Sequence, residues 1–188
     1  MEKYVVLDIE STGTKPTESE IIEIGALYIQ DNQIVKKFNT FVKPTQSIPS
    51  YVTNITGIQD EWVKFAPDIS KVLPKFISFC EDAVLVGHNI TLFDYRILKA
   101  NAIKLNLDFN FKIIDTLLIA RSGLKHLESR KLGDLCTFYN INLTNAHRAY
   151  SDALATYYLL LNLHKDFGED NPDLFIPKQV NWKIPKPK

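Results

Sequence analysis

The chain has 188 residues, of which 45% are hydrophobic, and its 22 Lys and Arg residues balance its 22 Asp and Glu residues. This composition excludes intrinsic disorder and suits one domain with a single core. Proteins that coat nucleic acid are usually basic, so the zero net charge argues against broad phosphate binding, and any nucleic acid would be held by a short stretch or by an end.

The sequence also bears on the cellular compartment. No apolar run approaches the roughly 18 residues that a membrane helix needs. Met1 and Glu2 lead straight into a strand pattern, so we expect no signal peptide. Cys80 and Cys136 lie far apart without the spacing of a metal site, which is typical of reduced core residues. We therefore expect a cytoplasmic protein with no membrane partner.

Three strand patterns open the chain. Residues 4–9 form a short run that is apolar on both faces, as expected for a central strand. Residues 21–30 and 34–43 are also strand-like, and residues 31–33 between them have the composition of a hairpin turn. The first part of the chain is therefore predicted to be an antiparallel meander.

Helical and strand patterns alternate after the meander. Helices are predicted over residues 68–81, 91–102, 115–121, 131–139 and 148–164, and strands over residues 83–87 and 111–114. This order predicts an α/β fold with a mixed central sheet of about five strands, in which the three-stranded antiparallel meander is followed by parallel strands and helices flank the sheet.

The composition changes near the C-terminus. Four of the nine prolines (172, 177, 185 and 187) lie close together there, among several lysines. We therefore divide the chain into a domain of residues 1–166 and a tail of residues 167–188. The tail is expected to be irregular and to pack on the domain or on a partner.

Asp8 and Glu10 are the first candidate functional residues. Residues i and i+2 of a strand point to the same face, so two carboxylates would project together from the centre of the sheet. Buried like charges are costly unless they are paired or bind metal. The alternative is that the strand ends at Leu7 and both acids are solvated.

His147 and Asp152 form a second candidate group. On one continuous helix, a separation of five residues places two side chains roughly 140° apart, so they would diverge. They converge only if His147 lies in the loop before the last helix and Asp152 lies within it. Taken alone, Asp152 is also explained by the favourable interaction of an acid with a helix N-terminus.

Asp94 is the only acid between Asp82 and Asp108, so it is the one carboxylate that the middle of the chain can supply. A capping role is the alternative, because Thr91 as N-cap and Asp94 three residues later nearly form a capping box.

The order of these groups is more specific than any one of them. Asp-x-Glu on a first strand, His88-Asn89 followed by Phe93-Asp94, and His147-x4-Asp152 on a last helix resemble the DnaQ-like branch of the DEDD-type 3′→5′ exonucleases. That branch includes the proofreading epsilon subunit of bacterial DNA polymerase III, ribonuclease T and oligoribonuclease. Further matching segments begin at Ser11, Ile55 and Asp115, and the resemblance covers about the first 165 residues. Two departures are Ser11, where the family usually has Thr, and three rather than two residues between Asn89 and Phe93.

The resemblance implies a ribonuclease H-like fold and a catalytic group of Asp8, Glu10, Asp94, His147 and Asp152. The four acids would bind two Mg²⁺ or Mn²⁺ ions, in keeping with the preference of these ions for oxygen ligands. His147 would be the general base.

Other residues are expected to contact substrate. The loop of Ser11, Thr12 and Gly13 would approach the terminal nucleotide, and Asn89 and Phe93 would support or stack on it. Phe93 is equally explained as a core residue. Arg148, together with the basic stretch of residues 121–131, would contact a few phosphates, although that stretch is also explained as a solvated loop.

The predicted function is therefore hydrolysis of phosphodiester bonds at single-stranded 3′ ends, with release of nucleoside 5′-monophosphates in proofreading or end trimming. The expected partners are a single-stranded 3′ end, with DNA favoured over RNA, and a DNA polymerase subunit. The alternatives are an RNA-directed enzyme similar to ribonuclease T or oligoribonuclease, and a catalytically idle module that docks on a polymerase.

Overall fold

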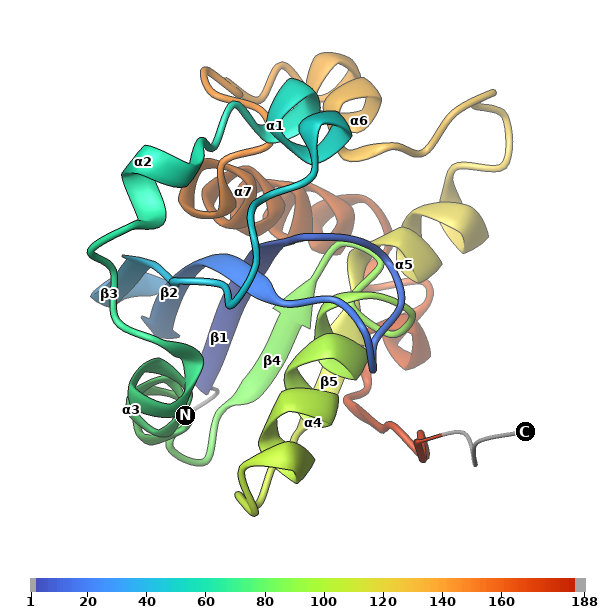
Figure 1. Cartoon of the computed structure of the whole chain (residues 1–188). Coiled ribbons are helices and arrows are strands. Elements are labelled where there is room, and N and C mark those ends of the chain that lie inside the picture. The colour runs from blue at the N-terminus through green and yellow to red at the C-terminus, as the bar shows by residue number, and fades with distance from the viewer. Residues whose placement is uncertain (1–2, 185–188) are drawn as a thin grey trace.

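A six-stranded mixed sheet forms the centre of the protein, shown in Figure 1 as a computed structural model that describes residues 3–184. The strands are β1 (Lys3–Ser11), β2 (Ile21–Gln30), β3 (Gln33–Phe41), β4 (Val84–Gly87), β5 (Lys112–Asp115) and β6 (Lys178–Gln179), in the order β3-β2-β1-β4-β5-β6. The first three strands pair antiparallel, whereas β1, β4 and β5 run parallel. The predicted α/β fold and its meander are confirmed.

The turn between β2 and β3 is shorter than predicted. Asp31 and Asn32 adopt positive φ angles of 52° and 59°, and Gln33 already belongs to β3. Two consecutive residues at positive φ are typical of a two-residue type I′ turn, whose twist matches that of the strands it joins.

Helices cover both faces of the sheet. They are α1 (Ser50–Thr56), α2 (Asp60–Val63), α3 (Ile69–Cys80), α4 (Asp94–Lys104), α5 (Thr116–Gly123), α6 (Leu132–Phe138) and α7 (Ala149–Phe167). In Figure 1, α3 and α4 lie on one face and α5 and α7 lie on the other. No helix among residues 3–184 is long and apolar enough to cross a membrane.

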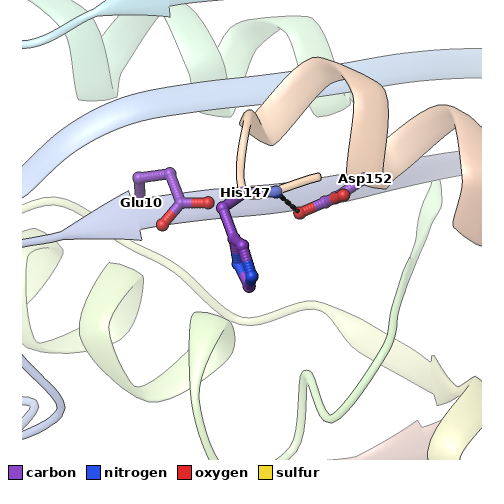
Figure 2. Close-up of side chains that lie close together, drawn as sticks. All are labelled: Glu10, His147 and Asp152. Carbon is purple, nitrogen blue, oxygen red and sulfur yellow. Dashed lines mark hydrogen bonds between the residues drawn. The ribbon is translucent and has the colours of Figure 1, made fainter. Parts of the chain in front are cut away.

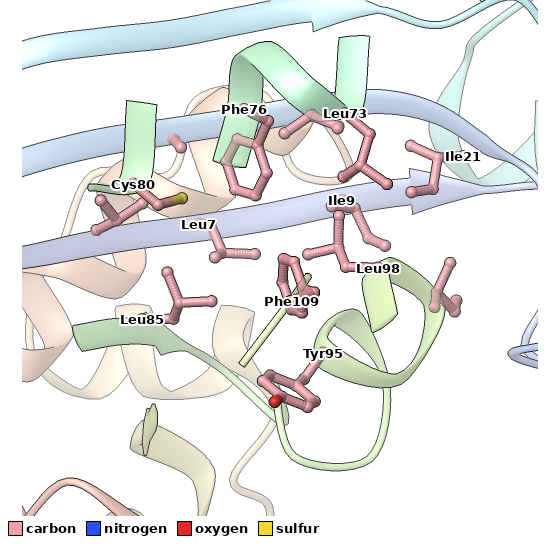
Figure 3. Packing of buried hydrophobic residues seen from close by; sticks show 14 of the residues in the cluster. Leu7, Ile9, Ile21, Leu73, Phe76, Cys80, Leu85, Tyr95, Leu98 and Phe109 are labelled. Carbon is pink, nitrogen blue, oxygen red and sulfur yellow. The ribbon is translucent and has the colours of Figure 1, made fainter. Parts of the chain in front are cut away.

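Alternation along β1 divides the core into two layers. Val5, Leu7 and Ile9 pack with α3 and α4, as Figure 3 shows for Leu7 and Ile9, whereas Val6 packs with α5 and α7. Because successive side chains of a strand point to opposite faces, Asp8 and Glu10 share the face of Val6, below α7. The strand thus remains regular through both acids, and the prediction that they share one face is confirmed.

Two local predictions differ from the structure. Residues 50–63, for which the sequence patterns predict no helix, contain α1 and α2 and contribute to a small third core cluster. The helix expected from residue 91 begins at Asp94 instead, because the carbonyl of Asn89 accepts hydrogen bonds from the N–H groups of Leu92 and Phe93 in a tight turn.

The tail is more ordered than expected. A 3₁₀ helix, Pro172–Phe175, packs Leu174 and Phe175 beside the α7-side core, and β6 then pairs antiparallel with β5. This pairing makes the sixth strand and covers the edge of the sheet. The division at residue 166 is a proposal, and prolines 185 and 187 and residues 1–2 lie outside the described residues.

Candidate active site

The carboxylates of Asp8 and Glu10 project from the C-terminal half of β1 toward the start of α7. Gly25 of β2 lies opposite Asp8 in the sheet. A Cβ atom at Gly25 would lie 2.2 Å from the backbone nitrogen of Tyr150, so only glycine permits α7 to approach this closely. The close contact brings Asp152, in the first turn of α7, over the two acids of β1.

His147 lies in the loop before α7, as predicted. The helix begins at Ala149 with Arg148 as its N-cap, and His147 has a φ of 61°. The backbone N–H of His147 donates a hydrogen bond of 3.0 Å to Oδ2 of Asp152, which closes the turn. Figure 2 shows the imidazole pointing away from α7, with Glu10 and Asp152 on either side of it.

Asp94 reaches the site from α4. Its side chain is 2% exposed, and Oδ1 accepts a hydrogen bond of 3.0 Å from the backbone N–H of Ile9, between Asp8 and Glu10. The capping-box alternative is wrong, because the hydroxyl of Thr91 donates to Asp115 rather than capping α4. Asp94 therefore belongs to the carboxylate group of β1.

Three candidates meet closely. One ligand atom each from Glu10, His147 and Asp152 lies within 4.8 Å of the others. Oδ1 of Asp152 is buried and has no hydrogen-bond partner among the described residues. A buried carboxylate oxygen normally has a partner, so this unpaired oxygen suits a cation. Mg²⁺ and Mn²⁺ prefer oxygen ligands, and carboxylates supply them. The residues that would hold such ions are Asp8, Glu10, Asp94 and Asp152.

Electrostatics place all four carboxylates in one group. Burial and then repulsion by Asp94, Glu10 and Asp152 raise the pKa of Asp8 well above its usual value. Burial and neighbouring acids raise the pKa of Glu10 to about 8, and burial raises that of Asp94 to about 7. Burial raises the pKa of Asp152 to about 6, against the hydrogen bond from His147. Such a group favours bound cations at neutral pH.

The predicted substrate loop follows Glu10 directly. Ser11 Oγ donates to the carbonyl of Gly13, and Thr12 is held by two hydrogen bonds with the backbone of Glu20 and one from the hydroxyl of Tyr51. The loop is therefore held rigidly at the same end of β1 as the acids, where a contact with substrate remains a proposal.

Asn89 and Phe93 lie between β4 and α4. Asn89 has a φ of 66°, its N–H donates to Asp115, and it lines the cleft described below. Phe93 is partly buried against the α3–α4 core, so its core role is the better supported. Asp115 accepts hydrogen bonds from Asn89, Thr91 and Leu117, so its carboxylate holds the turn that leads into α4.

A cleft of 720 Å³ opens beside the carboxylates. The residues that line it include Asn89, Arg121, Arg130, Lys131, His147 and Asp152. Arg130 is bound to the carbonyls of residues 124 and 125, which leaves Arg121 and Lys131 as the better placed phosphate contacts.

Glu23 is a fifth acid at this site and is absent from the site residues predicted from the sequence. It is 1% exposed on β2, directly opposite Glu10, and forms an ion pair of 2.9 Å with Arg148. A single acid within the otherwise apolar run of residues 21–29 was the available signal, because such a residue is buried only when it is paired.

Comparisons with known proteins show the family of the chain. A family model described as Exonuclease (RNase_T) matches residues 5–160. DNA polymerase III PolC-type from Caldanaerobacter subterraneus subsp. tengcongensis is 43% identical over 167 residues, and that from Thermotoga maritima is 42% identical over 159. These alignments cover 89% and 84% of this chain but only 12% of each relative, so the chain spans about an eighth of their length.

The fold is also that of solved exonucleases. E. coli exonuclease I in complex with a dT13 oligonucleotide superposes with a TM-score of 0.80 over 93% of this chain and 43% of that one, at 17% identity. This similarity confirms the ribonuclease H-like fold. Together with the family match over residues 5–160, it confirms the resemblance noted in the sequence, and the chain belongs to the DnaQ-like exonuclease (RNase_T) family.

Proposed function

We propose that the chain is a metal-dependent 3′→5′ exonuclease that removes nucleoside 5′-monophosphates from single-stranded 3′ ends, with DNA favoured as substrate. The observation that carries the proposal is the group of four acids and His147, which β1, α4, α7 and the loop before α7 bring to one end of the sheet. The names of the relatives, DNA polymerase III PolC-type, support DNA as the substrate and a polymerase as the partner. We further propose that the enzyme acts in proofreading or end trimming in the cytoplasm.

In this mechanism the chain's residues orient the substrate and move one proton. Asp8, Glu10, Asp94 and Asp152 would hold two divalent ions, Mg²⁺ or Mn²⁺, which supply positive charge to the scissile phosphate and the leaving 3′-oxygen. The exposed imidazole of His147, which lies between Glu10 and Asp152, takes the proton of the attacking water.

Substrate selection would follow from the small size of the binding surface. The Ser11–Gly13 loop receives the terminal nucleotide, and Arg121 and Lys131 neutralise a few phosphates at the cleft. Because the net charge of the chain is zero, phosphate contacts alone would not hold a long duplex. A free, unpaired 3′ end is therefore the expected substrate.

The test compares linear single-stranded DNA and RNA of the same sequence, labelled at either end, with Mg²⁺ or Mn²⁺. We expect a 3′ label to leave as mononucleotide at once, and a 5′ label to give a ladder that shortens with time. A circular single strand, which has no end, is the control and should remain intact. Faster cleavage of RNA would make the chain an RNA-directed enzyme, and no product from either polymer would favour a catalytically idle module.

A further inference from the structure

The buried carboxylate of Glu23 binds the start of α7. It accepts hydrogen bonds of 3.1 and 2.9 Å from Nε and Nη2 of Arg148, and one of 3.1 Å from the backbone N–H of Ala149. All three donors belong to two consecutive residues at the N-terminus of the helix. Glu23 thus ties α7 to β2 at the position opposite Glu10.

The guanidinium of Arg148 also contacts two aromatic rings. It lies 5.2 Å from the ring centre of Phe41 and 5.7 Å from that of Trp62. A planar guanidinium that is paired bidentately and stacked on aromatic rings is held in one orientation. Its hydrogen bonds with Glu23 also raise the pKa of Arg148. Nε and Nη2 of this group are thus committed to Glu23, whereas about a third of the side chain stays exposed.

The residue directly before Arg148 needs support. His147 has a φ of 61°, a backbone conformation that persists in a residue other than glycine only when its surroundings hold it. Its N–H is fixed by Asp152, and the chain on its other side is fixed by the bonds from Arg148 and Ala149 to Glu23. Both sets of hydrogen bonds therefore hold the backbone that carries the imidazole of His147.

We propose that Glu23 and Arg148, which we call the clamp, are positioning residues that hold His147 beside Glu10 and Asp152. This role rests on the proposed function, and it replaces the phosphate contact that the sequence suggested for Arg148. Displacement of a catalytic group by about 1 Å can cost about 100-fold in rate, so loss of the clamp should lower turnover rather than substrate affinity.

Steady-state kinetics on linear single-stranded DNA test the clamp. We expect Arg148→Ala and Glu23→Gln to lower kcat by about 100-fold, with KM changed by less than about twofold. Arg148→Lys should recover only part of kcat, because an ammonium keeps the charge but lacks the bidentate geometry. Lys36→Ala is the control, since it breaks an ion pair of 2.6 Å with Glu81 at the other end of the sheet, and should leave both constants unchanged.

A double variant separates positioning from a general structural effect. In a His147→Ala background there is no imidazole to position, so Arg148→Ala should lower the remaining rate by less than about threefold. Full additivity of the two losses would overturn the proposal. A raised KM that depends on salt, with kcat unchanged, would instead assign Arg148 to phosphate binding.

A readout that needs no activity completes the experiment. The chain has four histidines, so the ring signals in an NMR spectrum are few, and His147→Ala identifies one of them. Arg148→Ala and Arg148→Lys should shift or broaden the His147 signal and leave the other three in place. An unmoved His147 signal would refute the clamp even if the wild type proved inactive, whereas an inactive wild type whose His147 signal moves would refute only the proposed function.

Discussion

Individual carboxylates at this site are expected to serve metal binding rather than packing. Each of Asp8, Asp94 and Asp152 has a pKa above its usual value. Without a cation, the ionised form of each side chain therefore destabilises the folded protein. Asp94 also accepts a hydrogen bond from Ile9 that an amide oxygen could accept equally well. An amide at any of these positions should preserve the fold.

We therefore predict that Asp8→Asn, Asp94→Asn and Asp152→Asn each remove nearly all nuclease activity and leave the far-ultraviolet circular dichroism spectrum unchanged. Asp82→Asn, which alters an exposed acid paired with Lys3, is the matched control. A variant that keeps more than about a tenth of the wild-type rate, equivalent to about 1.4 kcal/mol of barrier, is not missing an essential ligand.

We expect His147 to act as a general base rather than as a metal ligand. We predict that His147→Ala lowers turnover by about 10²–10⁴-fold, as expected for loss of a general base, while Mn²⁺ affinity measured by calorimetry is retained. Because His147 lies within 4.8 Å of Glu10 and Asp152, the calorimetric result is informative in its own right. A large loss of Mn²⁺ affinity would instead make His147 a ligand.

At the scale of elements, the site depends on how closely α7 approaches β2. Gly25 is the point of contact, and an added methyl group would meet the backbone of Ala149 and Tyr150 at 2.2–2.5 Å. Backbone atoms of a helix cannot move aside as a side chain does. The helix that carries Asp152 would have to shift as a whole.

We predict that Gly25→Ala lowers the free energy of unfolding, measured in urea, by about 1–3 kcal/mol and also lowers turnover. Gly133→Ala in α6 is the control, because nothing lies within 4 Å of the added methyl group. Alanine in place of glycine within a helix should raise stability by up to about 1 kcal/mol. Equal stabilities of the two variants would contradict the close packing of α7 on β2.

At the scale of the whole molecule, the carboxylate group joins β1, α4 and α7, so its ionisation affects global stability. The pKa values of Glu10, Asp94 and Asp152 in the folded protein are about 8, 7 and 6, whereas those of the unfolded chain lie near 4. The folded state therefore binds more protons than the unfolded state across this interval. The contribution of this group to the free energy of unfolding should therefore fall as pH rises from about 4 to about 8.

We thus predict that the metal-free protein has a higher Tm at about pH 5.5 than at about pH 8, and that Glu10→Gln reduces the difference. Differential scanning calorimetry in the presence of a chelator measures both. A Tm that rises steadily over this interval would show that the four acids do not share one site.

Bound metal should offset the loss of stability that the ionised carboxylates cause in the metal-free protein. At 100 times its dissociation constant, a divalent ion that binds only the folded state adds about 2.7 kcal/mol, which for a chain of this length raises Tm by about 5–10 °C. We predict such a rise with millimolar Mn²⁺, and a much smaller one in Asp8→Asn. If Mn²⁺ left the Tm of the wild type unchanged, the four carboxylates would not form one metal site.

The sequence by itself determined the meander, the alternating helices and strands, and the placement of His147 before α7. These features follow from local periodicity and from the geometry of one strand or one helix, which neighbouring residues specify. The ordered motifs also identified the family, because Asp8, Glu10, Asp94, His147 and Asp152 occur in a specific order.

Only the tertiary structure decided the partners of those residues. The pairing of Glu23 with Arg148 joins positions 125 residues apart, and the hydrogen bond of Asp94 with Ile9 joins positions 85 apart. The same holds for Gly25, whose requirement comes from a helix that begins more than 100 residues later. Local patterns carry no record of such contacts, because they depend on which elements pack together and how closely. The candidate catalytic residues could thus be predicted from the sequence, whereas the contacts of Glu23, Arg148 and Gly25 could not.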